Sequence, residues 1–124
     1  MGFGKGYFIK VIEDAGKFVF QLWYVAKQEM GYSQLYSTYK ECEEGIEKFK
    51  KYLINSRPTE ENGLVKIVKL SSRNFIYKFC DESGEVLYTS RHIETKANCK
   101  KSALSTCKNF VHADIKDFVH KNHL

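Results

Sequence analysis

The sequence contains a single proline, four cysteines and no long apolar run among its 124 residues. Because its apolar stretches are short and interrupted by charges, no segment is predicted to cross a membrane as a helix. The first ten residues, MGFGKGYFIK, lack the apolar core of a secretory signal. Cysteines of proteins without such a signal are normally free thiols. We therefore expect a cytoplasmic protein with no membrane segment and no disulfide.

Motifs that bind metals are also missing. No pair of cysteines has the C-x-x-C spacing, and the spacing of Cys99, Cys107 and His112 matches no common zinc site. His120 and His123 would lie one turn apart on a helix, but no carboxylate or thiol completes a metal set with them. The sequence therefore predicts no metal site and no cofactor.

The net charge of +5 comes mainly from the second half of the chain. Residues 64–124 carry eleven Lys and Arg against six Asp and Glu, a balance of +5, whereas residues 1–57 carry nine against seven. A basic surface attracts nucleic acid or acidic partners. It is also typical of a solvated, lysine-rich surface, which is the favoured interpretation for so modest a charge.

The first half of the chain predicts three strands followed by a helix. Strands are indicated over residues 7–14, 17–25 and 27–33, where apolar residues alternate with polar ones. The apolar spacing then changes to that of a helix, which begins after Thr38 because Thr38 and Glu41 form a capping box. One apolar stripe runs along this helix: Tyr39, Cys42, Ile46, Phe49 and Leu53.

The second half repeats this plan at a shift of 57 residues, with strands over 64–70 and 74–80 and within 82–90. Two units that are each too small to bury a core should share one. Residues of the same class stand at equivalent positions: Phe18 and Phe75, Phe20 and Tyr77, Leu22 and Phe79, Met30 and Leu87, Ser33 and Ser90, Thr38 and Thr95, and Cys42 and Cys99.

We therefore predict a single domain over residues 1–124. Repeat one spans about 6–56, a polar linker with Pro58 spans about 57–63, and repeat two spans about 64–112. In the C-terminal tail, about 113–124, Asp114 is expected to cap a short helix.

The segments AGKFVFQL and SQLYSTYKECEEGIEKFKK combine an aromatic hairpin strand with a Ser, a Tyr and a helix containing Gly-Ile. With this combination the first half resembles the YegP-like family, small bacterial domains of unknown function. The second half matches more weakly, because Ile93 replaces the Tyr and Ser102-Ala103 replaces Gly-Ile. The residues that carry the resemblance are Gly16, Phe18, Phe20, Leu22, Ser33, Tyr36, Cys42, Gly45 and Ile46, with Phe75, Tyr77, Phe79, Gly84, Ser90 and Cys99 in the second half.

The resemblance implies an α+β fold of two tandem antiparallel β-β-β-α repeats, related by a pseudo-twofold axis and sharing one core. It implies no activity and no catalytic residue. Ser33 and Ser90 recur at equivalent positions, but all four histidines lie in the second half, so the serines cannot share one histidine arrangement. We expect them to form structural hydrogen bonds, and Cys42 and Cys99 to be buried small hydrophobes. The sequence thus predicts no enzyme and no small-molecule substrate.

Binding is predicted instead through basic side chains and an outward-facing tryptophan. Trp23 lies on the strand face opposite Phe20 and Leu22, where it would suit a partner or stack on a base. The leading hypothesis is a non-enzymatic interaction module that binds a protein partner or itself. The alternative is a nucleic-acid-binding module that uses the basic second repeat. The basic candidates on or just before the second helix are Arg91, Lys96, Lys100, Lys101 and Lys108.

Overall fold

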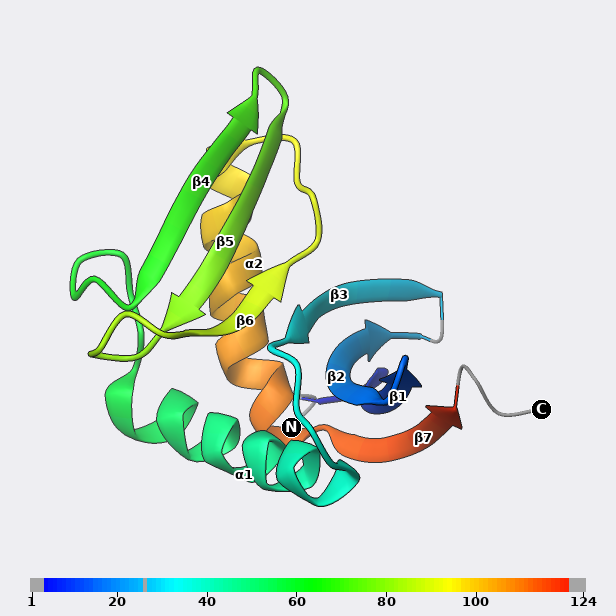
Figure 1. Ribbon diagram of the computed structural model, residues 1–124. Helices are drawn as coiled ribbons and strands as arrows, with labels where there is room; N and C mark the ends of the chain where they lie inside the picture. Colours follow the sequence, from blue (N-terminus) through cyan, green and yellow to red (C-terminus); the bar gives the residue numbers. More distant parts are fainter. Residues whose placement is uncertain (1–3, 26, 121–124) are drawn as a thin grey trace.

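The computed structural model describes residues 4–25 and 27–120, which form one curved sheet and two α-helices (Figure 1). Within these residues, neither helix is long and apolar enough to span a bilayer. The elements follow the order β1 (Tyr7–Asp14), β2 (Lys17–Tyr24), β3 (Gln28–Ser33), α1 (Tyr39–Ser56), β4 (Val65–Ser71), β5 (Asn74–Cys80), β6 (Val86–Ser90), α2 (Lys96–Asn109), a 3-10 turn η1 (Phe110–His112) and β7 (Asp114–His120).

The sheet has the strand order β4-β5-β6-β3-β2-β1-β7. Strands β1 to β6 pair antiparallel with their neighbours, whereas β7 runs parallel to β1. The two halves of the chain meet where β3 pairs with β6, through Gly31 with Ser90, Tyr32 with Thr89 and Ser33 with Tyr88. The fold is therefore α+β with a mixed sheet.

The helices begin where the sequence predicts. The hydroxyl of Thr38 accepts a hydrogen bond of 3.0 Å from the backbone N–H of Glu41, at the start of α1. The Glu41 carboxylate accepts from the backbone N–H of Ser37, which completes the capping box one residue earlier than its usual position. Thr95 accepts in the same way at the start of α2, from the backbone N–H of Asn98. Each helix thus opens on a threonine that satisfies an otherwise unpaired donor.

Ser33 and Ser90 form the structural hydrogen bonds expected of them. The Ser33 hydroxyl accepts from the backbone N–H of Phe20 and donates to the backbone carbonyl of the following residue, at 3.0 and 2.7 Å. The Ser90 hydroxyl accepts from the backbone N–H of Tyr77 and likewise donates to the next carbonyl, at 2.9 and 2.7 Å. Both serines are buried at the end of a strand, where they hold the outgoing chain.

The C-terminal tail is a strand, so the prediction of a short helix capped by Asp114 is wrong. Strand β7 pairs with β1 from Phe8 with Asp114 onward, and it makes the sheet mixed instead of wholly antiparallel. A helix of so few residues is marginal alone, whereas the unpaired edge of β1 offers backbone partners along its length. His120 is the last residue of β7, and His123 lies outside the described residues.

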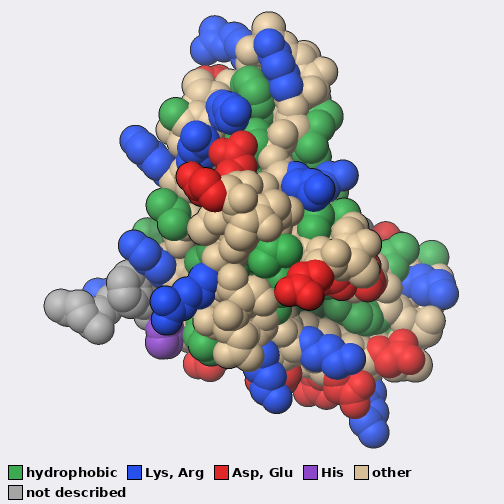
Figure 2. All heavy atoms as spheres, turned by 90° about the vertical axis from the view of Figure 1, so that its left-hand side faces the viewer, with side chains coloured by type: hydrophobic (Ala, Val, Ile, Leu, Met, Phe, Trp, Pro, Cys, Tyr) green, Lys and Arg blue, Asp and Glu red, His purple; other side chains and the backbone are tan. Residues whose placement is uncertain are grey.

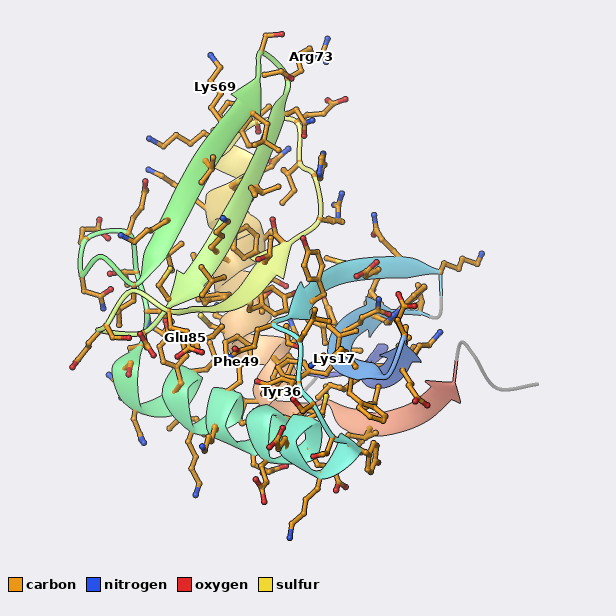
Figure 3. All side chains as sticks on the ribbon, viewed as in Figure 1. Lys17, Tyr36, Phe49, Lys69, Arg73 and Glu85 are labelled. Carbon is orange, nitrogen blue, oxygen red and sulfur yellow. The ribbon has the colours of Figure 1, made fainter. Side chains whose placement is uncertain are left out.

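The two helices pack on one face of the sheet around an aromatic cluster. The predicted stripe of α1 is buried there, except for the half-buried Tyr39. Phe49 of α1 stands at the centre, between α1 and the sheet (Figure 3). Its ring lies 6.1 Å from that of Phe20, 5.7 Å from that of Phe79, 5.4 Å from that of Tyr88 and 4.8 Å from that of Phe110. One helix residue thus joins rings from both halves of the chain.

Gly31 provides the space for Tyr88 at the junction of β3 and β6. The Tyr88 ring is fully buried and lies directly over Gly31, so that a Cβ at this position would overlap the ring. Gly45 of α1 has a similar relation to Tyr36, but the Tyr36 side chain is only half-buried. The Tyr36 side chain can therefore move away from a methyl group at residue 45, whereas the buried Tyr88 ring cannot move away from one at residue 31.

We predict that Gly31→Ala lowers the free energy of unfolding by about 2–3 kcal/mol, because the close-packed core leaves Tyr88 no alternative position. Urea unfolding followed by circular dichroism measures the change. The control is Gly45→Ala. Alanine has the higher helix propensity, which restores about 1 kcal/mol of the free energy of unfolding lost through the overlap with Tyr36. Equal losses in the two variants would contradict this account of the junction.

Candidate functional site

The lysines predicted as candidates lie together on the exposed side of α2. The opposite side of this helix is buried through Cys99, Ala103 and Thr106. At the centre of the exposed side Leu104 is 58% exposed, and three of the lysines stand three or four positions from it. Helix α2 contains no acidic residue. We call the following residues the α2 surface: Lys96, Lys100, Lys101, Leu104 and Lys108.

Helix α1, at the equivalent place in the first half, has a different charge pattern. Its acidic and basic residues balance and are mostly exposed. The cationic surface is therefore a property of α2 and not of the fold as such. The charged residues of α1 are Glu41, Glu43, Glu44 and Glu47, with Lys40, Lys48, Lys50 and Lys51.

Hydroxyl groups under α2 hold its lysines outward. The Tyr77 hydroxyl is within 3.0 Å of the Ser102 hydroxyl and 2.8 Å of the Thr106 hydroxyl, and burial raises the pKa of Tyr77 to about 12. The Tyr7 hydroxyl lies 3.2 Å from that of Ser105. These contacts hold one side of the helix toward the sheet, and the Tyr77–Thr106 contact pairs two hydroxyl groups that would otherwise be buried alone.

The linker before β4 lies against the α2 surface. The Glu60 carboxylate is 3.8 Å from Nζ of Lys96 and 3.5 Å from Nζ of Lys100. The side chains of both lysines are 58% exposed, so these ion pairs contribute little to stability and leave the ammonium groups accessible to solvent.

A small apolar groove opens beside this linker, between β4 and α2. Its volume is about 180 Å³. Figure 2 views the molecule from this side, where basic side chains border apolar surface with a few acidic side chains between them. We call it the β4–α2 groove, and it is lined by Pro58, Thr59, Glu60, Glu61, Val65, Ile67, Lys100, Ala103 and Leu104.

Arg91 lies before α2 and is not part of the α2 surface. It is half-buried, and Nη1 of its guanidinium donates to the backbone carbonyl of His92 at 3.1 Å. It lines a separate depression of about 440 Å³ together with Lys101 and Met30. Of the basic candidates, the structure therefore brings the four lysines together and leaves Arg91 at one side.

Trp23 lies on the face of the sheet that the helices do not cover. Its ring is half-buried, 6.4 Å from that of Phe8, with Nζ of Lys10 4.2 Å from its centroid. Its indole N–H donates to the side chain of Gln21 at 2.8 Å. The predicted aromatic residue and the predicted lysines are therefore on different faces of the molecule.

An acidic cleft of about 550 Å³ lies between α1 and the β5–β6 turn. Tyr36, Phe49 and Glu85 lie around it in Figure 3. Burial raises the pKa of the Tyr36 hydroxyl. The pKa of Asp81 is lowered, mainly by the hydrogen bond from the Ser83 hydroxyl. Sequence reasoning missed this cleft because its lining comes from three separate segments. It missed Glu60 because the linker is distant in sequence from α2. Leu104 could have been found from helical spacing, since it stands three or four positions from Lys100, Lys101 and Lys108.

The cysteine side chains are buried or half-buried among other side chains, as small hydrophobic residues are. Cys42 and Cys99 are fully buried under their helices, and all four thiols are free. Burial, aided by the charge of Glu43, raises the pKa of Cys42 to about 12, and burial raises that of Cys107 to about 11. Among the side chains that the structure describes, those of residues 4–25 and 27–116, no three His, Cys, Asp or Glu gather as a metal site would require.

Two solved structures share this architecture, an α+β fold with one sheet and two helices. A solution structure of the UPF0339 protein SO3888 from Shewanella oneidensis superposes with a TM-score of 0.74 at 15% identity, over 96% of this chain and 99% of that one. The protein of unknown function yegP from E. coli superposes with a TM-score of 0.72 at 15% identity, over 92% and 94%. No family model and no curated protein matches the sequence. The chain therefore has the YegP fold.

We predict that Cys42 reacts with iodoacetamide roughly a thousandfold more slowly at pH 8 in the folded protein than after unfolding, because so little of it is thiolate. Mass spectrometry of labelled peptides measures both rates. A thiol pKa raised by folding favours the folded state below about pH 9, and this contribution is lost as the pH rises toward 12. Labelling of native Cys42 as fast as that of the unfolded chain would contradict its burial.

Proposed function

We propose that this chain is a YegP-like, cytoplasmic, non-enzymatic interaction module that binds a protein partner through the α2 surface. The observation that carries the proposal is the combination of four exposed lysines, no acidic residue in α2 and the exposed Leu104 at their centre. An apolar residue surrounded by like charges suits a partner surface with an apolar contact and an acidic rim.

The placement of Trp23 favours a protein over a nucleic acid as the partner. Binding to single strands combines basic residues with aromatic rings on which bases stack. Here the tryptophan is on the far face of the sheet from α2, where it is covered in part by Phe8 and Lys10. Nucleic-acid binding through the basic second half is the alternative, and it would rest on phosphate contacts alone.

A non-enzymatic role is supported by the state of the reactive groups. The two recurrent serines are committed to backbone hydrogen bonds, and the pKa of Cys42 and of Cys107 is raised, away from the range of an activated thiol.

We also infer that the two halves are structural repeats related by a pseudo-twofold axis between β3 and β6. The inference is supported by the same order of three strands and a helix in each half and by the strand order, which runs outward from this pair as β3-β2-β1 and β6-β5-β4. The equivalent hydrogen bonds of Ser33 and Ser90 and the threonine caps of both helices add to it.

The proposal is tested with a display library of random twelve-residue peptides selected on the protein. Anisotropy of labelled peptides then compares the wild type with Lys100→Glu/Lys101→Glu. We predict that this variant binds the selected peptides at least about tenfold more weakly, because two cations at the α2 surface become anions. The control, Lys40→Glu/Lys51→Glu, makes the same charge change on exposed residues of α1 and should alter affinity less than about threefold.

Two results would overturn the proposal. One is that the α2 and α1 variants bind the peptides equally. The other is that random oligonucleotides bind more tightly than any peptide, with an affinity that falls by about 10³ or more between 50 and 200 mM salt, which would establish the nucleic-acid alternative.

A further inference from the structure

The outermost strands of the sheet are β4 and β7, and in the described part of the chain no strand pairs with the outer edge of β4. The backbone N–H of Cys80 donates to the carbonyl of Leu64 at 2.8 Å, so residues 64 and 80 form a hydrogen-bonded pair. Such pairs alternate along antiparallel strands. It follows that Lys66 and Val68 point their backbone groups toward β5, whereas Ile67 and Lys69 point theirs toward the free edge.

The linker already occupies the first position of this edge. The backbone N–H of Val65 donates to the carbonyl of Thr59 at 3.0 Å, and the neighbouring Glu60 places its carboxylate between Lys96 and Lys100. Two consecutive residues of the linker therefore place a backbone carbonyl, that of Thr59, against β4 and a carboxylate, that of Glu60, against α2. Beyond them, Ile67 lines the β4–α2 groove, and Lys69 follows two residues later on the same edge of β4.

The residues around the groove indicate the chemistry of a segment that would pair with the edge of β4 beyond the linker. Side chains of an added strand alternate between the two faces of the sheet. On the helix side they would meet Ile67, Ala103 and Leu104, which are apolar. The rim beside them carries exposed Lys69 and Lys100, with Lys69 at the far end of β4 (Figure 3).

We propose that β4 and the β4–α2 groove bind an extended acidic peptide segment, with alternating apolar residues, as an additional strand of the sheet. Backbone hydrogen bonds to Ile67 and Lys69 hold the segment, and its apolar side chains enter the groove beside Leu104. Its carboxylates pair with the lysines of the α2 surface, as Glu60 does within the chain. This proposal rests on the proposed function above and names the partner's conformation and chemistry.

Amide hydrogen exchange of the wild-type protein tests the backbone pairing directly. The probe is a selected twelve-residue peptide that depends on Lys100 and Lys101. We expect the amides of Ile67 and Lys69 to exchange at least about tenfold more slowly when the peptide is bound, because they gain hydrogen bonds. The amides of Lys66 and Val68, already bonded to β5, should change little. Equal protection of all four amides, or of none, would overturn the proposal.

A matched pair of variants tests the same edge by affinity. Lys69→Pro and Lys69→Thr both remove the charge, but only the proline removes the edge N–H. We expect Lys69→Pro to weaken peptide binding at least about tenfold relative to Lys69→Thr, provided that circular dichroism shows both to be folded. If the proline variant does not fold, the exchange measurement decides.

The outcomes separate this proposal from the function it rests on. Peptides that require Lys100 and Lys101 but leave the Ile67 and Lys69 amides unprotected would keep the protein-binding function and overturn strand addition. A selection that yields no lysine-dependent peptide would overturn both.

Discussion

The packing of the Tyr88 ring on Gly31 is the closest fit at the centre of the sheet, and it sets how β3 and β6 come together. Strands β3 and β6 share only three residue pairs at the centre of the sheet, and a large ring from one strand covers a glycine of the other. Because Gly31 has no side chain, the Tyr88 ring can lie 5.4 Å from that of Phe49, which in turn contacts rings from both halves. Because the core is close-packed, a shift of the Tyr88 ring would be felt by Phe49 of α1 and by Phe110, which directly follows α2.

The two helices meet this shared core in different ways, and the difference leads to the candidate surface. Helix α1 contributes Phe49 and other large apolar residues, whereas α2 contributes Ala103 and Thr106 and is held by the hydroxyl of Tyr77. Short side chains and hydrogen bonds attach α2 to the core. Only one narrow side of this helix, with Cys99, Ala103 and Thr106, is therefore buried. Its remaining surface carries lysines around Leu104, beside the free edge of β4.

The sequence predicts the local elements well, because their signals are local. Alternation around Phe20 and Tyr77 and the threonine before each helix are confirmed, as is the burial of Cys42 and Cys99. The tail was predicted wrongly because the partner of β7 is β1, more than a hundred residues earlier, and no local pattern records a parallel pairing of that kind. The clustering of four lysines on α2 follows from helical spacing, but the proximity of Glu60 and the groove depends on how the linker returns over α2.

Under the proposed function, partners bind at α2 and β4 and not at the outer face of the sheet or the acidic cleft. A titration of the ¹⁵N-labelled protein with a selected acidic peptide, followed by amide chemical shifts, would locate the bound peptide on the protein. We predict the largest shifts in α2 and in β4, with no change at the indole N–H of Trp23, the single tryptophan. Shifts centred on Trp23, or on Tyr36 and Glu85 in the acidic cleft, would contradict it.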